Sequence, residues 1–278
     1  MATDKFGIKK FFSTKIGGRE WISKWDSNPR KWTSNGTDVR NADPYDAECD
    51  LHCKAEERGI VTHADVDGKG ICELYGTTPR LYINDPNRIK KWFNLEMTCY
   101  FQVVKKLPAG GAYVGLRLAG RSNHQNEYNC TASGTGYSFE SKASNGTNQL
   151  KKELVHPAYA DNIISSTNGC KTGVWYGHKL IIGKQNSENH VLVQGWRDTT
   201  EGKDGGNWVK LVEKIDKGDW AMTDSVDLDA FNKAKSCKDF PKYPSPTSIL
   251  DKSAISCYFR CDNVQVRLKW ASIREIGK

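Results

Sequence analysis

Residues 95–104, with the sequence LEMTCYFQVV, decide the fold class of this chain, because apolar and polar side chains alternate along them. In an extended backbone successive side chains point to opposite sides, so this segment has one apolar and one polar face. The apolar face consists of Leu95, Met97, Cys99, Phe101 and Val103, and the other face carries Glu96, Thr98, Tyr100 and Gln102. A period of two predicts a half-buried β-strand.

The next segment repeats this alternation. It follows the turn-forming sequence PAGG at residues 108–111 and reads YVGLRLAGR at residues 113–121. Its apolar face consists of Val114, Leu116 and Leu118, and its polar face of Tyr113, Arg117 and Arg121. We predict that the two segments pair as an antiparallel hairpin.

Further strands are predicted from the same pattern, with Gly-rich and Asn-rich connections between them. They are residues 71–75, 80–83, 136–142, 150–156, 179–183, 190–196, 208–215, 255–261 and 264–273. About eleven strands fit two packed sheets. The sequence therefore predicts an all-β chain, folded as a two-sheet antiparallel β-sandwich of the jelly-roll kind with minor short helices.

Helical periodicity is confined to the sequence DLDAFNKAK at residues 227–235, where Asp227 is placed to cap a helix. The Pro-containing stretch 238–248 is the most linker-like, but the strands after it have the alternation needed to complete the same sheets. We therefore predict one domain over residues 1–278, with N-terminal strands and loops at 1–94 and the main sandwich at 95–276.

Composition and charge narrow the class of partner. The chain has 278 residues, 41 Lys and Arg against 33 Asp and Glu, and a net charge of +8. This excess suits an anionic partner such as an acidic polysaccharide or a nucleic acid, although solubility alone explains it equally well. No stretch reaches the run of about 18 apolar residues that a membrane helix needs, so no membrane partner is predicted.

The first ten residues, MATDKFGIKK, lack the apolar centre of a secretory signal. This fits either a cytoplasmic protein or the processed chain of a secreted one. Of these locations, an extracellular or cell-surface one is favoured. The oligomeric state is left open.

Cysteine and histidine residues raise the question of a metal site. The chain has nine cysteines, and an odd number leaves at least one thiol unpaired. Possible zinc ligands are Cys49, His52, Cys53, His63 and Cys72, but their spacing matches no standard finger and loop cysteines could instead form disulfides. The sequence DVDGKG at residues 65–70 begins like a calcium loop, yet Lys69 occupies a ligand position. We predict a turn there, and no metal or cofactor.

Polar residues are densest on three predicted strands and their continuations. The candidate substrate-binding residues are Arg117, Arg121, Glu140, Lys152 and Glu153, and the candidate acid and base groups are His124, His156 and Tyr159. Outward residues of neighbouring antiparallel strands line up, so these groups are expected on one sheet face. Together, Arg, His and Tyr can bind a carboxylate, remove a carbon-bound proton and protonate a leaving oxygen. A solvated face with cross-strand ion pairs is the equally weighted alternative.

The sequence CYFRC at residues 257–261 adds two candidates to this face. Cys257 and Cys261 share the parity of Phe259 and are expected in the core as buried thiols. Tyr258 and Arg260 then face the polar surface, and we expect them beside Arg267 and Lys269 of the following strand.

Five segments resemble polysaccharide-lyase-like jelly rolls of the concanavalin A-like lectin and glucanase superfamily, which includes alginate and glucuronan lyases. They are YVGLRLAGR, KKELVH followed by a Tyr, VWYGHKLII, HVLVQGWRD and VQVRLKWASIREI. The resemblance covers residues 95–276 and is one of pattern. The Arg-Thr/Ser-Glu-Leu-Arg, Gln-Ile/Val-His and Tyr-Phe-Lys-Ala-Gly motifs of alginate lyases are not intact here, and the Glu-x-Asp-x-x-Glu motif of retaining glucanases is missing.

This resemblance implies a lyase that cleaves an acidic, uronate-containing polysaccharide by β-elimination, and it favours that partner over a nucleic acid. Arg117 and Arg121 would neutralise the uronate carboxylate. His124 or His156 would be the base, and Tyr159 or Tyr258 the acid. The alternatives are a non-catalytic glycan-binding jelly roll and a surface or capsid protein, because the same architecture serves all three.

Overall fold

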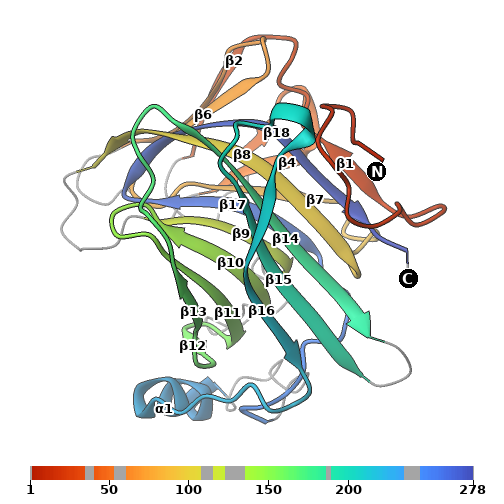
Figure 1. Ribbon diagram of the computed structural model, residues 1–278, viewed down its shortest axis with the longest axis vertical. Helices are drawn as coiled ribbons and strands as arrows, with labels where there is room; N and C mark the ends of the chain where they lie inside the picture. The colour runs from red at the N-terminus through yellow and green to blue at the C-terminus, as the bar shows by residue number, and fades with distance from the viewer. Residues whose placement is uncertain are drawn as a thin grey trace.

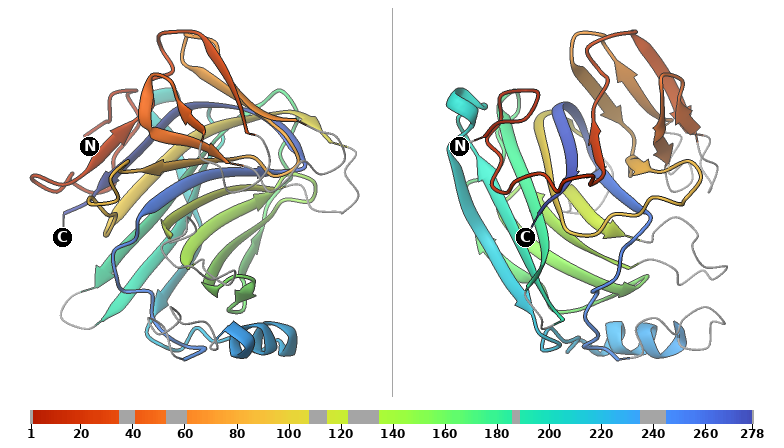
Figure 2. Two further views of the ribbon diagram at one scale, coloured as in Figure 1. Left: turned by 180° about the vertical axis from the view of Figure 1, so that it is seen from behind. Right: turned by 90° about the vertical axis from the view of Figure 1, so that its right-hand side faces the viewer.

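The structure, a computed structural model, describes residues 2–34, 41–52, 61–107, 115–122, 135–185, 189–234 and 245–277. Two antiparallel sheets pack face to face in it (Figures 1 and 2). The predicted all-β, two-sheet sandwich is therefore confirmed.

The first sheet is named here the β8 sheet, after its central strand. Its strands, in spatial order, are β16 (Trp208–Asp216), β15 (His190–Asp198), β14 (Trp175–Gln185), β8 (Leu95–Lys106), β18 (Val264–Glu275), β6 (Ile71–Tyr75), β5 (Thr62–Val66) and β2 (Arg30–Ser34), and β1 (Glu20–Ile22) also pairs with β18.

The second sheet is named the β9 sheet. Its strands, in spatial order, are β12 (Ala158–Tyr159), β11 (Thr147–Val155), β10 (Gly136–Lys142), β9 (Gly115–Ser122), β17 (Ser256–Asp262), β7 (Arg80–Asn84), β4 (Asp46–His52) and β3 (Asn41–Asp43), and β13 (Ile163–Ser166) also pairs with β11. Strands that precede Leu95 thus contribute to both sheets.

The predicted hairpin of residues 95–104 and 113–121 is wrong. These segments form β8 and β9, which lie in different sheets. β8 pairs with β14 along one edge and with β18 along the other, so neither edge is left for β9. A strand has only two hydrogen-bonding edges, and partners distant in sequence occupy both of them here.

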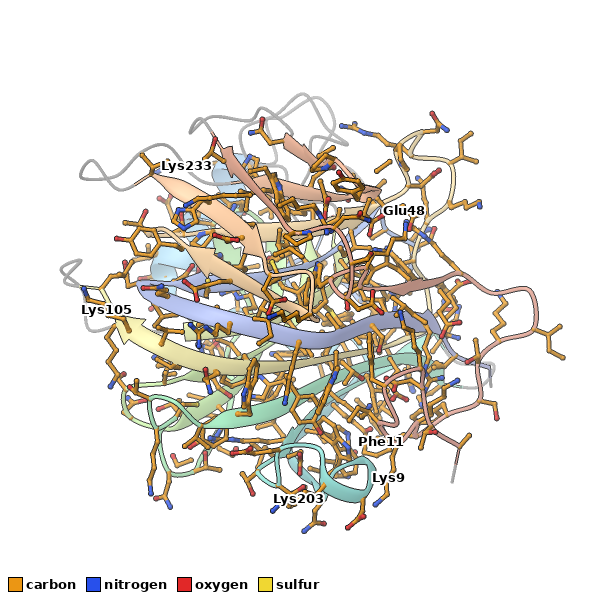
Figure 3. All side chains as sticks on the ribbon, turned by 90° about the horizontal axis from the view of Figure 1, so that it is seen from above. Lys9, Phe11, Glu48, Lys105, Lys203 and Lys233 are labelled. Atoms are coloured by element: carbon orange, nitrogen blue, oxygen red, sulfur yellow. The ribbon has the colours of Figure 1, made fainter. Side chains whose placement is uncertain are left out.

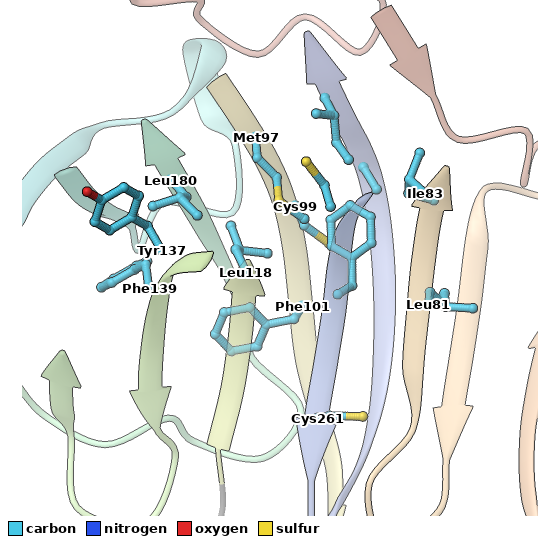
Figure 4. Packing of buried hydrophobic residues seen from close by; sticks show 14 of the residues in the cluster. Leu81, Ile83, Met97, Cys99, Phe101, Leu118, Tyr137, Phe139, Leu180 and Cys261 are labelled. Atoms are coloured by element: carbon cyan, nitrogen blue, oxygen red, sulfur yellow. The ribbon is translucent and has the colours of Figure 1, made fainter. Parts of the chain in front are cut away.

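The core lies between the two sheets. Met97, Cys99 and Phe101 of β8 face Leu118 of β9, with Phe139 of β10 beside them (Figure 4). Cys257, Phe259 and Cys261 of the CYFRC segment alternate along β17 and are buried in this core, which confirms their expected placement.

The polar side of β8 is also buried, which corrects the expectation of a half-exposed strand. Glu96 is only 1% exposed, because the chain before β1 lies against the outer face of the β8 sheet. The Lys9 amide donates to the Gly205 carbonyl at 3.0 Å, and the Phe11 amide donates to Glu96 Oε2 at 3.0 Å. Figure 3 shows Lys9 and Phe11 close to Lys203 at this side of the molecule. The segment of residues 2–14 is called the N-terminal strap below.

The predicted helix is present as α1 (Ser225–Ala234), but its cap is not the predicted residue. Asp224 Oδ1 accepts the amide hydrogens of Val226 at 2.8 Å and Asp227 at 3.3 Å, so Asp224 caps the helix. Asp227 instead accepts the backbone N–H of Tyr159 at 3.0 Å, which ties α1 to the edge of the β9 sheet. Among the helices in the described ranges, none is long and apolar enough to cross a membrane.

Candidate functional site

The outer face of the β9 sheet gathers most of the candidate residues. Arg260 of β17 lies opposite Arg117 of β9, which lies opposite Glu140 of β10. Glu153 of β11 lies opposite Tyr159 of β12. Tyr258 is two positions from Arg260 and therefore has the same parity.

Glu140 is the centre of a buried charge cluster on this face. Arg117 donates to Glu140 Oε2 through Nε at 3.0 Å and through Nη2 at 2.7 Å, and Lys151 Nζ lies 3.6 Å from the same oxygen. Gln149 Nε2 donates to the other oxygen, Oε1. The carboxylate itself has no exposed surface. Two cations and an amide therefore compensate one buried negative charge.

Beside this cluster, Glu153 orients His156. His156 Nδ1 lies 2.7 Å from Glu153 Oε1, and the imidazole side chain is 42% exposed whereas Glu153 is buried. A carboxylate can only accept, so Nδ1 donates its hydrogen to Glu153. In the neutral ring, Nε2 is then the nitrogen that can take up a proton.

Two tyrosines of this face are held in the protonated form. Burial, and then the negative charge of Glu153, raises the pKa of Tyr159 far above its usual range. Burial raises the pKa of Tyr258 to about 12, and the Arg117 charge opposes that rise. Both phenols therefore serve as hydrogen donors at neutral pH. The Lys151 ammonium lies 5.2 Å from the centre of the Tyr159 ring.

The remaining charged candidate on β17 also has a partner. Arg260 Nε donates to Asp262 Oδ1 at 2.7 Å, and the arginine side chain is 15% exposed. The two arginines that meet across β9 and β17 are thus each paired with a carboxylate of the same sheet.

Two of the predicted substrate-binding residues are not brought to this face. Lys152 points into the sandwich, where its ammonium lies 2.8 Å from Asp216 Oδ2 and 3.2 Å from the Trp220 carbonyl. Arg121 has a positive φ of 53° beside a register shift between β9 and β17, and its guanidinium donates to the Lys252 carbonyl at 3.0 Å. His124 lies outside the described residues.

Lys151 lies on this face in place of the predicted Lys152, because side chains alternate between the two faces of a strand. Glu153 and Lys152 are adjacent in β11, so they cannot share a face of a regular strand. Lys151, two positions before Glu153, is the lysine that the structure places beside Glu140. Counting in steps of two from Glu153 would have selected it from the sequence.

The expectation that Arg267 and Lys269 extend this face is wrong. Both belong to β18 in the β8 sheet, on the opposite side of the sandwich. Arg267 Nε lies 2.9 Å from Glu73 Oε2 there.

The described zinc candidates do not converge. Cys49 and Cys72 lie in the core, whereas the His63 ring stacks on Tyr75 and the His52 ring meets Tyr82. Cys53 falls outside the described residues. Within the described part of the chain, no three His, Cys, Asp or Glu residues are grouped so as to hold a metal ion. The cysteines described there are free and buried: Cys49, Cys72, Cys99, Cys170, Cys257 and Cys261.

Comparison with known proteins gives structural similarity alone, since no protein-family model and no curated protein matches this chain. The chain is similar to carbohydrate-binding module CBM66 from Bacillus subtilis, with 7% identity, a TM-score of 0.42, and coverage of 88% of this chain and 95% of that one. It is similar to alginate lyase vAL-1 from Chlorella virus, with 10% identity, a TM-score of 0.38, and coverage of 75% and 86%. It is also similar to the winged bean acidic lectin, with 8% identity, a TM-score of 0.41, and coverage of 90% and 100%. These neighbours include a binding module, a lyase and a lectin.

Proposed function

We propose that the outer face of the β9 sheet binds an acidic, uronate-containing polysaccharide and cleaves it by β-elimination. The observation that carries this proposal is the pair formed by His156 and Glu153, with the protonated phenol of Tyr159 on the strand opposite Glu153. A base held by a carboxylate and a nearby protonated acid are the two groups that elimination requires.

In the proposed reaction, Nε2 of His156 removes the proton from the carbon next to the uronate carboxylate. The electron pair of that bond forms a carbon–carbon double bond, and the neighbouring glycosidic carbon–oxygen bond breaks. Tyr159 gives its proton to the leaving oxygen. Arg117 and Arg260 supply positive charge near the carboxylate, which makes the carbon-bound proton more acidic.

A non-catalytic glycan-binding role is the second candidate, and a specific observation favours it. Arg117 already binds Glu140, and Arg260 already binds Asp262. Each arginine therefore offers a substrate less net charge than an unpaired one would. A face of this kind suits hydrogen bonding to a sugar without the strong carboxylate neutralisation that elimination requires.

The test is a panel of alginate, glucuronan, pectate and glycosaminoglycans, followed by the ultraviolet absorbance of an unsaturated uronate product. We expect one member to yield the product, and His156→Ala and Tyr159→Phe each to lower turnover by about 10² to 10⁴-fold. Arg267→Gln, on the opposite sheet, is the control that should leave turnover unchanged. Binding of a panel member without any product would replace the lyase by the glycan-binding role.

A further inference from the structure

A second surface lies on the outer face of the β8 sheet, across the sandwich from His156. Its centre is Lys269 of β18, whose ammonium lies 3.8 Å from the centre of the Trp270 ring and 4.4 Å from that of Trp175. All three residues are partly exposed. An ammonium between two indoles is the geometry of a cation–π contact.

A β-bulge creates this arrangement. Lys269 lies opposite Tyr100 of β8 and Ser272 lies opposite Thr98, so two residues of β18 stand against the single residue Cys99. The extra residue, Trp270, has a φ of 53°, which is rare for a bulky side chain. Consecutive residues of a regular strand point to opposite faces, but this bulge places Lys269 and Trp270 on the same one.

The Trp270 ring is held in place from one side. The Tyr100 ring meets it edge-on, with the ring centres 5.2 Å apart. Gly202 approaches it so closely that an added Cβ would lie 2.7 Å from the indole, and Gly202 has a φ of 83°. Strain in β18 and a glycine in the neighbouring loop thus both serve to position one aromatic ring beside Lys269.

Lys269 forms no salt bridge with a carboxylate among the described residues. Other cations of the same face differ: Arg267 lies 2.9 Å from Glu73, and Lys210 lies 2.7 Å from Glu213. Burial lowers the pKa of Lys269, although the charge of Glu201 counteracts this. A partly desolvated ammonium without a paired carboxylate attracts an anion.

We infer that Trp175, Lys269 and Trp270 form a second subsite that takes an acidic sugar residue, with the sugar carboxylate on Lys269 and the sugar ring against Trp175. The class of ligand rests on the proposed function, while the location rests on the geometry of β18 and β14. Such a subsite would hold a second segment of the polysaccharide away from the site of cleavage.

A single-stranded nucleic acid is the competing ligand, because it too combines charge with stacking. It needs a row of cations along its phosphates. The next outward cation on β18, Arg267, is already paired with Glu73, so it offers a phosphate less net charge than an unpaired cation would. This pairing favours the sugar.

The experiment uses the full chain carrying His156→Ala, so that the probes are bound and not cleaved. Calorimetric titration with alginate and pectate oligosaccharides measures affinity and the number of sites, and neutral cello-oligosaccharides and single-stranded RNA are the comparison probes. We expect two uronate sites per chain. Lys269→Gln and Trp175→Ala should each weaken one of them about tenfold or more, because each removes a charged or stacking contact.

Two further variants separate binding from folding. Lys269→Arg keeps a cation that also stacks on aromatic rings, so it should retain affinity within about threefold. Lys210→Gln is the matched control, since Lys210 lies over Trp196 at 5.8 Å but is paired with Glu213. The unfolding midpoint of every variant confirms that it is folded.

The inference is overturned if the folded Lys269→Gln and Trp175→Ala variants bind uronate oligosaccharides as tightly as the parent does. It is also overturned if RNA binds this surface more tightly than the uronate oligosaccharides do. Unsaturated product from the chain with His156 intact, together with unchanged binding in these variants, would refute the subsite and leave the proposed function standing. Loss of one site in these variants without any product from that chain would refute the lyase and leave the subsite standing.

Discussion

Glu96 and Glu140 lie on opposite outer faces of the sandwich, and each is paired with one lysine and one arginine. Lys179 Nζ lies 2.8 Å and Arg274 Nη2 lies 2.6 Å from Glu96 oxygens, just as Lys151 and Arg117 surround Glu140. Both carboxylates are almost fully buried. A glutamate between a lysine and an arginine is therefore not by itself a sign of function in this protein.

The surroundings of the two glutamates differ. Glu96 also accepts backbone hydrogen bonds from Phe11 and Phe12, and the N-terminal strap closes over it. On the other face, the charged cluster continues to Glu153 and to His156, whose ring is partly exposed. The comparison teaches that an accessible ionisable group next to a buried network marks a candidate for chemistry, whereas a network closed on every side is structural.

The largest effect is expected for Glu96→Ala, which leaves the ammonium of Lys179 and the guanidinium of Arg274 buried without their carboxylate. Breaking a buried pair in this way destabilises a protein by about 3 to 5 kcal/mol. The measurement is the free energy of unfolding from denaturant titration. Glu73→Ala removes the partly exposed partner of Arg267 and is the control, with an expected change of about 0 to 1 kcal/mol. Equal small effects for both variants would show that the Glu96 network is not closed to water.

An intermediate effect is expected at alkaline pH from Tyr258→Phe. Burial raises the pKa of Tyr258 from 10.0 to about 12, so the folded protein holds the phenolic proton more tightly than the unfolded chain does. This stabilisation is complete below pH 10.0 and is lost as the pH rises to about 12. A pKa difference of two units between the folded and unfolded states corresponds to about 2.7 kcal/mol. Over this pH interval the unfolding free energy of the variant should therefore fall by about 2 to 3 kcal/mol less than that of the parent.

The measurement is the unfolding free energy of parent and variant from pH 8 to 12, compared by slope so that a constant offset does not matter. Tyr100→Phe tests the same behaviour on the opposite face, where burial and then Asp198 raise the tyrosine pKa far above its usual range. Parallel curves for Tyr258→Phe and the parent would contradict a protonated phenol buried on the β9 face.

The smallest effect is expected for Phe11→Leu in the N-terminal strap. The Phe11 ring meets Trp196 edge-on, with ring centres 4.6 Å apart, and such pairs contribute about 0.5 to 1.5 kcal/mol beyond their buried area. The unfolding free energy should fall by about 1 kcal/mol. Ile16→Ala, at a fully exposed position, is the control that should change nothing. No difference between the two variants would mean that the strap does not help to close the Glu96 network.

Part of the candidate site follows from local sequence. Glu153 and His156 are three residues apart, and Arg117, Glu140 and Tyr258 have outward parity in their strands, so spacing alone could propose them. Arg121 shows where such reasoning stops, because a register shift between β9 and β17 accompanies its removal from the face. Lys152 has the opposite parity to Glu153, so the same spacing rule indicates Lys151 in its place.

The sequence by itself determined eleven strands, β6 to β11 and β14 to β18, and the packing of two sheets, because alternation is a property of one extended backbone. For β1 to β5, β12 and β13 it predicted no bounds. Only the tertiary structure decided that β8 and β9 lie in different sheets, that the N-terminal strap covers Glu96, and that the bulge in β18 sets Trp270 beside Lys269. These features depend on which distant segment occupies each strand edge and on what covers each face. The partner of each strand edge and the cover of each sheet face are decided by packing across the whole chain, so the pattern of a single stretch of residues cannot predict them.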